Sequence, residues 1–80
     1  MMDFGEAIRA MREGKRVQRQ GWNGKGMWLA LYQPAAKFQK TGNFPYPTMP
    51  FIVMKTVDDQ IVPWLASQTD MLAEDWMECP

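Results

Sequence analysis

The sequence predicts an α+β fold in which an N-terminal helix packs on a small twisted antiparallel sheet, with a long irregular loop. A helical apolar pattern occurs once, near the start, and short apolar segments separated by turn residues follow it. The 80 residues are expected to form a single domain, 1–80, and a domain of this size buries only about 60% of its unfolded surface. The chain is 46% hydrophobic and has no histidine and one cysteine, so self-association is expected to stabilise it in place of disulfides or zinc.

Residues 3–13 carry the predicted helix. Asp3 and Glu6 have the spacing of a capping box, and Gly14 is a typical residue after a helix C-terminus. Apolar residues recur at intervals of three and four and form one stripe. The residues of this stripe are Phe4, Ala7, Ile8 and Met11.

Strands are predicted over residues 15–20, 27–32, 51–57, 60–65 and 75–78. Between the first two, the Asn23-Gly24 pair is the strongest hairpin signal in the chain. The strand 27–32 is apolar on both alternating faces, so its second face needs cover from a helix, a loop or another subunit. Residues 33–50 form a long loop with four prolines, and loops of this length are generally functional or disordered. Ser67 is predicted to cap a short helical turn that Asp70 closes from the other side.

The charge and hydropathy of the chain argue against several partners. The formal net charge is zero, whereas proteins that bind DNA or RNA normally carry a basic excess. No apolar run approaches the length of a membrane span, and acidic residues begin at Asp3, unlike a signal peptide. We therefore expect a cytoplasmic protein without membrane or nucleic-acid partners, and no cofactor is predicted.

No catalytic set is visible, so an enzyme is not expected. The absence of histidine removes the usual base for a serine or cysteine nucleophile, and Cys79 is expected in a frayed tail. Asp58 and Asp59 have the position of solvated turn residues. Three further acidic residues could bind a metal ion in principle, but capping or surface roles explain them as well, and no metal site is predicted. These three residues are Asp70, Glu74 and Asp75.

The sequence instead carries residue types that bind a nucleotide-like small molecule. Tryptophan faces stack on bases, amide and carboxylate side chains recognise base edges and hydroxyl groups, and cations meet phosphates. Such residues gather around Trp22 and after Trp64. The candidate ligand-binding residues are Arg19, Trp22, Asn23, Lys25, Trp64, Gln68, Thr69 and Asp70.

Structural roles compete with this interpretation. Trp64 suits a core as well as a ligand platform, and Asp70 suits a helix cap as well as a ligand contact. Trp28 and Trp76 are expected in the core or at a subunit interface.

Two specific strings, GWNGKG at residues 21–26 and WLASQTD at residues 64–70, carry a family resemblance. FGEAI at residues 4–8 and PFIVMKT at residues 50–56 extend it over most of the chain outside the loop. The chain resembles a phage and prophage family that includes the second type of Thoeris anti-defence protein. It departs from the family pattern at Asp58-Asp59-Gln60, where a glycine is common.

The resemblance implies a protein that sequesters cyclic nucleotide immune signals without cleaving them. The implied signals are glycocyclic ADP-ribose made by Thoeris TIR enzymes and, in some members, cyclic dinucleotides. It also implies homotetramers with pockets at subunit contacts. Two other hypotheses remain, a phage structural or protein-interaction module and a hydrolase of the same signals.

Overall fold

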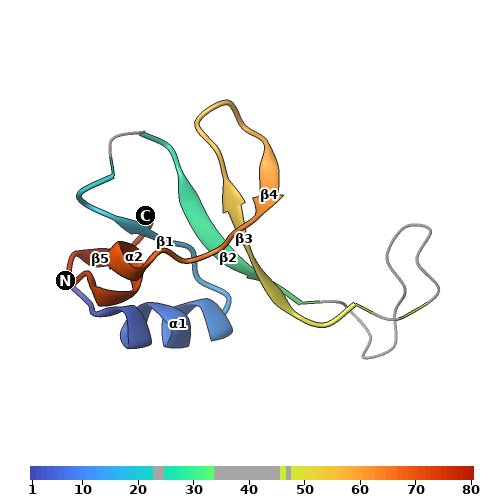
Figure 1. Cartoon of the computed structure of the whole chain (residues 1–80), viewed down its shortest axis with the longest axis horizontal. Coiled ribbons are helices and arrows are strands. Elements are labelled where there is room, and N and C mark those ends of the chain that lie inside the picture. The colour runs from blue at the N-terminus through green and yellow to red at the C-terminus, as the bar shows by residue number, and fades with distance from the viewer. Residues whose placement is uncertain (23–24, 34–45, 47) are drawn as a thin grey trace.

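One long helix and a five-stranded antiparallel sheet make up most of the computed structural model, which describes residues 1–22, 25–33, 46 and 48–80 (Figure 1). The sheet order is β4-β3-β2-β1-β5, and the α+β prediction is confirmed. Asn23, Gly24 and most of the 33–50 loop lie outside the described residues. In chain order the elements are α1 (Phe4–Arg12), β1 (Val17–Arg19), β2 (Trp28–Tyr32), β3 (Phe51–Lys55), β4 (Ile61–Pro63), α2 (Gln68–Leu72) and β5 (Trp76–Glu78).

Helix α1 has the capping box that its sequence predicts. The backbone N–H of Glu6 donates to Asp3 Oδ1 at 2.8 Å, and the N–H of Asp3 donates to Glu6 Oε1 at 3.1 Å. These two bonds satisfy N–H groups that have no partner within the helix. At the other end Gly14 has φ +87°, a conformation that favours glycine, and it turns the chain towards β1.

The strands are shorter than the sequence suggested, most clearly at β1. The predicted strand 15–20 begins too early because the N–H of Lys15 still bonds to Ala10 O, at 3.1 Å, and closes the end of α1. It ends too late because the chain turns after Arg19, where the N–H of Trp22 bonds to Arg19 O at 3.3 Å. The β1 strand nevertheless pairs with both β2 and β5. Its pairing with β5 brings the N-terminal part of the chain beside the C-terminal part.

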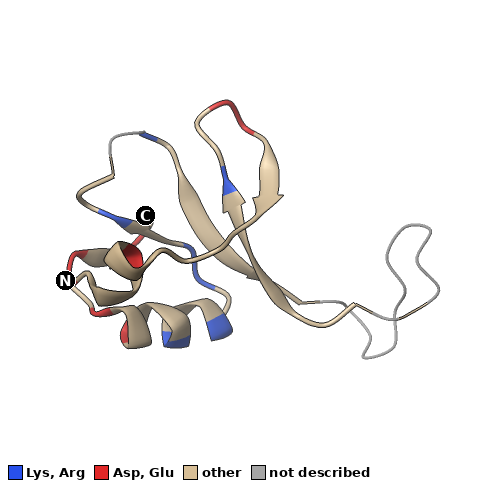
Figure 2. Ribbon diagram, in the orientation of Figure 1, with Lys and Arg blue, Asp and Glu red and all other residues tan. Residues whose placement is uncertain are grey.

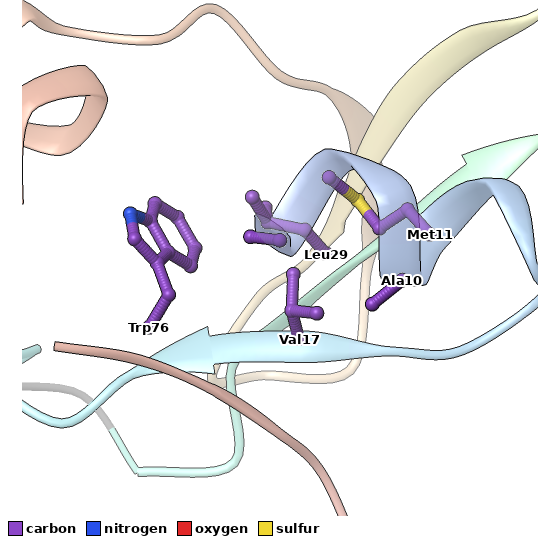
Figure 3. Packing of buried hydrophobic residues seen from close by; sticks show 6 residues of the cluster. Ala10, Met11, Val17, Leu29 and Trp76 are labelled. Atoms are coloured by element: carbon purple, nitrogen blue, oxygen red, sulfur yellow. The ribbon is translucent and has the colours of Figure 1, made fainter. Parts of the chain in front are cut away.

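The core lies between α1 and one half of the sheet, as Figure 3 shows for side chains that point towards one another. It draws on α1, β1, β2 and β5, and Trp76 of β5 is its largest side chain. The prediction that Trp76 lies in a core or an interface is therefore confirmed for the core. The buried residues are Ala7, Ala10, Met11, Val17, Leu29 and Trp76.

The second face of β2 has no helix over it among the described residues. The Arg16 guanidinium lies 5.1 Å from the centre of the Trp28 ring, and the Tyr32 ring lies 5.2 Å from that of Phe51 on β3. Side chains from the same sheet thus cover this face in part. The β3–β4 hairpin extends beyond α1 (Figure 1) and keeps its apolar side chains more exposed.

The C-terminal tail is attached to the sheet, so the expectation of a frayed tail is wrong. The N–H of Cys79 donates to Arg16 O at 2.9 Å, which continues the pairing of β5 with β1. Burial of the Cys79 thiol raises its pKa, although the charge of Arg16 opposes the shift. A thiol with a raised pKa is a poor nucleophile.

Candidate ligand-binding site

The end of β1, helix α2 and the residues before β5 meet around one guanidinium group. Arg19 Nη1 donates to Asp70 Oδ1 and Arg19 Nε donates to Asp75 Oδ1, both at 2.8 Å. The arginine side chain is 17% exposed, and so is that of Asp70. Figure 2 shows basic and acidic segments of these elements side by side. One cation facing two carboxylates leaves this group with a net negative charge.

The Asp75 carboxylate also holds the turn that follows β1. Its Oδ2 accepts the backbone N–H of Gly21 at 2.8 Å, and the backbone N–H of Gln20 donates to Asp75 O at 3.0 Å. A β-carbon on Gly21 would lie 2.9 Å from Asp75 Oδ2, closer than real contacts allow. Glycine at this position therefore permits the carboxylate to approach the backbone.

Asp70 has a different role from the one its spacing predicted. Ser67 caps α2, because its Oγ accepts the N–H of Asp70 at 3.1 Å. The Asp70 carboxylate does not close the cap from the other side; its Oδ1 accepts from Arg19 and, at a longer 3.4 Å, from Trp22 Nε1. The same residue thus contributes its backbone to the helix and its side chain to the site.

Both carboxylates have a lowered pKa. Burial of Asp70 raises its pKa, but the hydrogen bonds from Arg19, Ser67 and Trp22 together lower it further than burial raises it. The hydrogen bond from Arg19 is the main cause of the lowered pKa of Asp75, with the Gly21 N–H adding to it. The bonds to the same two carboxylates raise the pKa of Arg19. All three groups are therefore ionised at neutral pH.

Two candidate aromatic residues flank the buried Trp76. The Trp22 ring lies 5.5 Å from the Trp76 ring at an interplanar angle of 80°, and the Trp64 ring lies 6.2 Å away at 85°. Such edge-to-face contacts are favourable for aromatic pairs. Trp64 also packs against Phe4 of α1 at 6.1 Å, so its core role and its place beside the site coexist.

A hollow of about 320 Å³, open to solvent, lies beside the Trp22 turn. This volume is at the lower end of the range of small-molecule pockets, about 300–1,000 Å³. Its surface combines an aromatic ring, amide side chains and the exposed cation Lys25. The described residues that line it are Gln18, Arg19, Gln20, Trp22, Lys25, Gly26, Met27 and Met77.

The structure brings together part of the set that the sequence predicted. Arg19, Trp22 and Asp70 are in direct contact, and Lys25 shares the hollow with the first two. Trp64 reaches them through Trp76 and does not line the hollow. Gln68 and Thr69 are exposed on α2 and do not line it either, and Asn23 lies outside the described residues.

Comparisons with known proteins agree with the resemblance in these motifs. Residues 2–79 match the Thoeris anti-defense 2-like domain. The chain belongs to this family. It is similar to the Thoeris anti-defense 2 protein of Bacillus phage SP01, with 44% identity over 81 aligned residues that cover 94% of this chain and 91% of the phage protein.

Asp75 and Trp76 also belong to the group of contacts around the candidate site, and no sequence motif assigns them to it. The sequence pattern indicates a capping, surface or metal-ligand role for Asp75 and a core or interface role for Trp76. Asp75 reaches Arg19, and Trp76 reaches Trp22, because β5 pairs with β1 from Val17↔Glu78 to Arg19↔Trp76. The only sequence signal is a polar residue, Asp75, followed by an aromatic one, Trp76, at the start of a predicted strand. This pattern indicates a strand, but it does not show that the strand pairs with β1.

Neither a metal-binding cluster nor a membrane-spanning helix occurs among the described residues. No group of three or more acidic or cysteine side chains there is arranged to hold a metal ion, and Asp70 and Asp75 are both engaged with Arg19. No helix in the described part of the chain has the length and hydropathy needed to span a membrane.

Proposed function

We propose that this protein binds cyclic nucleotide immune signals, above all glycocyclic ADP-ribose, and sequesters them intact in the cytoplasm of the infected cell. Cyclic dinucleotides are the second class of ligand proposed. Membership of the Thoeris anti-defense 2-like family supports a phage role against Thoeris defence. The observation that supports ligand binding at this place is the position of Trp22, which lines an open hollow of mixed polar and apolar residues while Asp70 and Trp76 contact its ring.

The charges around the hollow suggest how such a ligand is oriented. The guanidinium of Arg19 already faces two carboxylates, which reduces its attraction for a phosphate. Lys25 is exposed at the same hollow and is the better candidate for the pyrophosphate. A carboxylate repels phosphate, so Asp70 is expected on the side of a ribose hydroxyl or an exocyclic amine.

A homo-oligomer, with a tetramer as the preferred form, is part of the proposal. A hollow of about 320 Å³ that is open to solvent would enclose only part of a molecule with a base, two ribose units and a pyrophosphate. Walls from a second subunit would complete it. The exposed apolar side chains of β4, with Ile61 57% and Val62 39% exposed, support self-association, since exposed apolar edge strands readily pair with other chains.

Inhibition by sequestration is a matter of mass action. The protein must outnumber the signal molecules and bind them with nanomolar affinity or better, about −12 kcal/mol. Base stacking on tryptophan is worth about 1–3 kcal/mol per base, and charge-assisted bonds and exclusion of water contribute the remainder.

A capture-and-release experiment tests the proposal. Purified oligomer in excess is mixed with glycocyclic ADP-ribose, the free fraction is removed, and the protein is heat-denatured before mass spectrometry of the supernatant. Recovery of the intact signal is expected. Cleaved products would support the hydrolase hypothesis, and absence of capture together with no thermal shift would support a structural or interaction module.

The site itself is tested by Trp22→Ala against a matched control, Trp28→Ala. Both rings are partly buried, but Trp28 lies under Arg16 on β2 and does not line the hollow. Loss of one stack of about 1–3 kcal/mol predicts a Kd about 5- to 150-fold higher for Trp22→Ala. Equal weakening by both substitutions, measured by calorimetry on variants of unchanged oligomeric state, would argue against the assigned site.

A further inference from the structure

The Asp75 carboxylate connects three separate parts of the site. One oxygen accepts from Arg19 Nε at the end of β1, and the other accepts the backbone N–H of Gly21 in the following turn, each at 2.8 Å. Asp75 itself stands directly before β5. Its side chain is 26% exposed and does not line the hollow, so its oxygens serve the protein and not a ligand in that hollow.

These bonds fix the backbone next to Trp22. Gly21 immediately precedes Trp22, whose own N–H bonds to Arg19 O at 3.3 Å. The Trp22 side chain is fixed separately, by Asp70 Oδ1 at 3.4 Å and by the T-shaped contact with the Trp76 ring. Because Arg19 bonds to both carboxylates, the backbone and side-chain restraints on Trp22 meet at one guanidinium.

We propose that Asp75 and Arg19 are positioning residues, which hold Trp22 in the orientation that lines the hollow. Asp75 does not line the hollow; Arg19 does, but its guanidinium is already engaged by Asp70 and Asp75. This inference rests on the proposed function, because it assigns the way in which the same site is built. It replaces the expectation that Arg19 meets a phosphate, and it leaves Lys25 as the cation for that group.

Three substitutions in the hydrogen-bonded group Arg19, Asp75 and Gly21, here called the Arg19–Asp75 connection, and one control outside it isolate this role. Asp75→Asn keeps the size of the side chain but has one acceptor oxygen where the carboxylate has two, so Arg19 and Gly21 cannot both be satisfied. Gly21→Ala keeps every charge and displaces the carboxylate, whose Oδ2 would lie 2.9 Å from the new β-carbon. Arg19→Lys keeps the charge and loses the planar fork. Glu74→Gln, at an exposed neighbouring position, makes the same charge change as Asp75→Asn outside the connection.

The first measurement needs no ligand. The protein is labelled with 5-fluorotryptophan, and its four tryptophan signals are followed by fluorine NMR, with the Trp22 signal assigned from Trp22→Phe. The Trp22 signal is expected to shift or broaden in the three connection variants and to stay unchanged in Glu74→Gln. The Trp28 signal is expected to stay unchanged throughout and reports that the sheet remains folded.

The second measurement is the Kd for glycocyclic ADP-ribose in the same variants. Loss of a charge-assisted bond that orders the ring predicts about 10- to 100-fold weaker binding for Asp75→Asn, and near-native binding for Glu74→Gln. An unperturbed Trp22 signal, or a perturbed signal with native affinity, would overturn the positioning role. If the wild-type protein does not bind glycocyclic ADP-ribose, the proposed function is refuted. A perturbed Trp22 signal in the variants would then still establish that Asp75 and Arg19 position Trp22. Should Asp75→Asn not fold, Gly21→Ala and Arg19→Lys give the same decision.

Discussion

The two halves of the sheet are built by different means. In the half that α1 covers, β5, β1 and β2 provide buried side chains, and Leu29, Val17 and Trp76 are fully inaccessible. In the β3–β4 hairpin none of the described side chains is fully buried, and β4 is exposed along its whole length. The first half is held mainly by packing. The second is held by its hydrogen-bonded ladder to β2, by its turn and by the partly buried Ile52 and Met54, which pack against the core.

This difference explains where the candidate site lies. Orienting Trp22 and Asp70 requires neighbours that do not move, and these neighbours are the buried Trp76 and the paired strands β1 and β5. The hairpin offers apolar surface without such support, which suits contact with another subunit better than the recognition of a small polar ligand. The candidate site and the exposed strand β4 thus lie towards opposite edges of one sheet.

The largest difference in stability between the two halves of the sheet is expected for Leu29→Ala compared with Ile61→Ala. Leu29 is 0% exposed on β2, and Ile61 is 57% exposed on β4. Truncating the buried leucine removes contacts and leaves a cavity, which typically costs about 2–5 kcal/mol of unfolding free energy. Truncating the exposed isoleucine is expected to change it by less than about 1 kcal/mol. Urea unfolding followed by tryptophan fluorescence measures both.

Protein concentration is the control for this pair. If Ile61 is buried between subunits, its substitution gains a cost that grows with the degree of association, because binding stabilises the folded form. A large effect of Ile61→Ala at concentrations where sedimentation shows monomers would contradict the division into a packed half and an unpacked half.

Acid is expected to lower the unfolding free energy mainly through the half of the sheet that α1 covers, and less through the β3–β4 hairpin. Folding lowers the pKa of Asp70 and Asp75 below the ordinary value of 3.8, through Arg19 and its bonds. A carboxylate with a lowered folded-state pKa adds stability that is complete above the unfolded pKa and is lost as pH falls through the folded one. Wild-type stability is therefore expected to fall from about pH 4 downwards, and Asp75→Asn should flatten this fall.

Asp58 in the hairpin turn is the matched control for acid. Its pKa is lowered as well, mainly by the Thr56 hydroxyl, which donates to Asp58 Oδ1 at 2.6 Å. Because this contact is exposed and involves no paired arginine, Asp58→Asn should leave most of the acid response in place. Urea midpoints at pH 7 and pH 3 compare the two variants. If both substitutions reduce the loss of stability at pH 3 equally, the contacts of Arg19 with the carboxylates do not account for the acid response.

Local patterns were enough to predict much of the packed half. The Asp3 and Glu6 spacing predicted the capping box of α1, and Gly14 predicted its end. These signals are local, since each depends on residues a few positions apart. The strand limits were less accurate because the start of β1 depends on the bond from Lys15 to Ala10 that closes α1, and its end on the bond from Gln20 to the distant Asp75.

Candidate residues for a site could be proposed from the sequence, but the contacts among them could not. Trp22 and Asp70 stood out because aromatic and polar residues cluster around each of them in the sequence. That Arg19 would face two carboxylates could not be read from the chain, because Asp70 and Asp75 reach it only through the pairing of the first and last strands. Asp75 was missed as a site residue for the same reason.

The smallest expected effect lies at the tip of the hairpin, at Asp59. Its φ of 65° is in the left-handed region, at the turn where the family resemblance led us to expect glycine. This conformation costs a side chain about 1 kcal/mol and costs glycine almost nothing. Asp59→Gly also loses an ion pair with Lys55, but Asp59 is 79% exposed in that pair, and such pairs contribute little. We expect a net stabilisation of about 0.5 kcal/mol, or an increase in Tm of about 2–4 °C.

The control for this substitution is Asp58→Gly in the same turn. Asp58 has no positive φ to relieve, and its carboxylate accepts the Thr56 hydroxyl that also receives the N–H of Gln60 at 3.0 Å. Glycine at this position should therefore lower Tm. If both glycine substitutions raise Tm, or neither changes it, then the hairpin does not depend on the conformation of its turn, and its stability must come from the ladder to β2 alone.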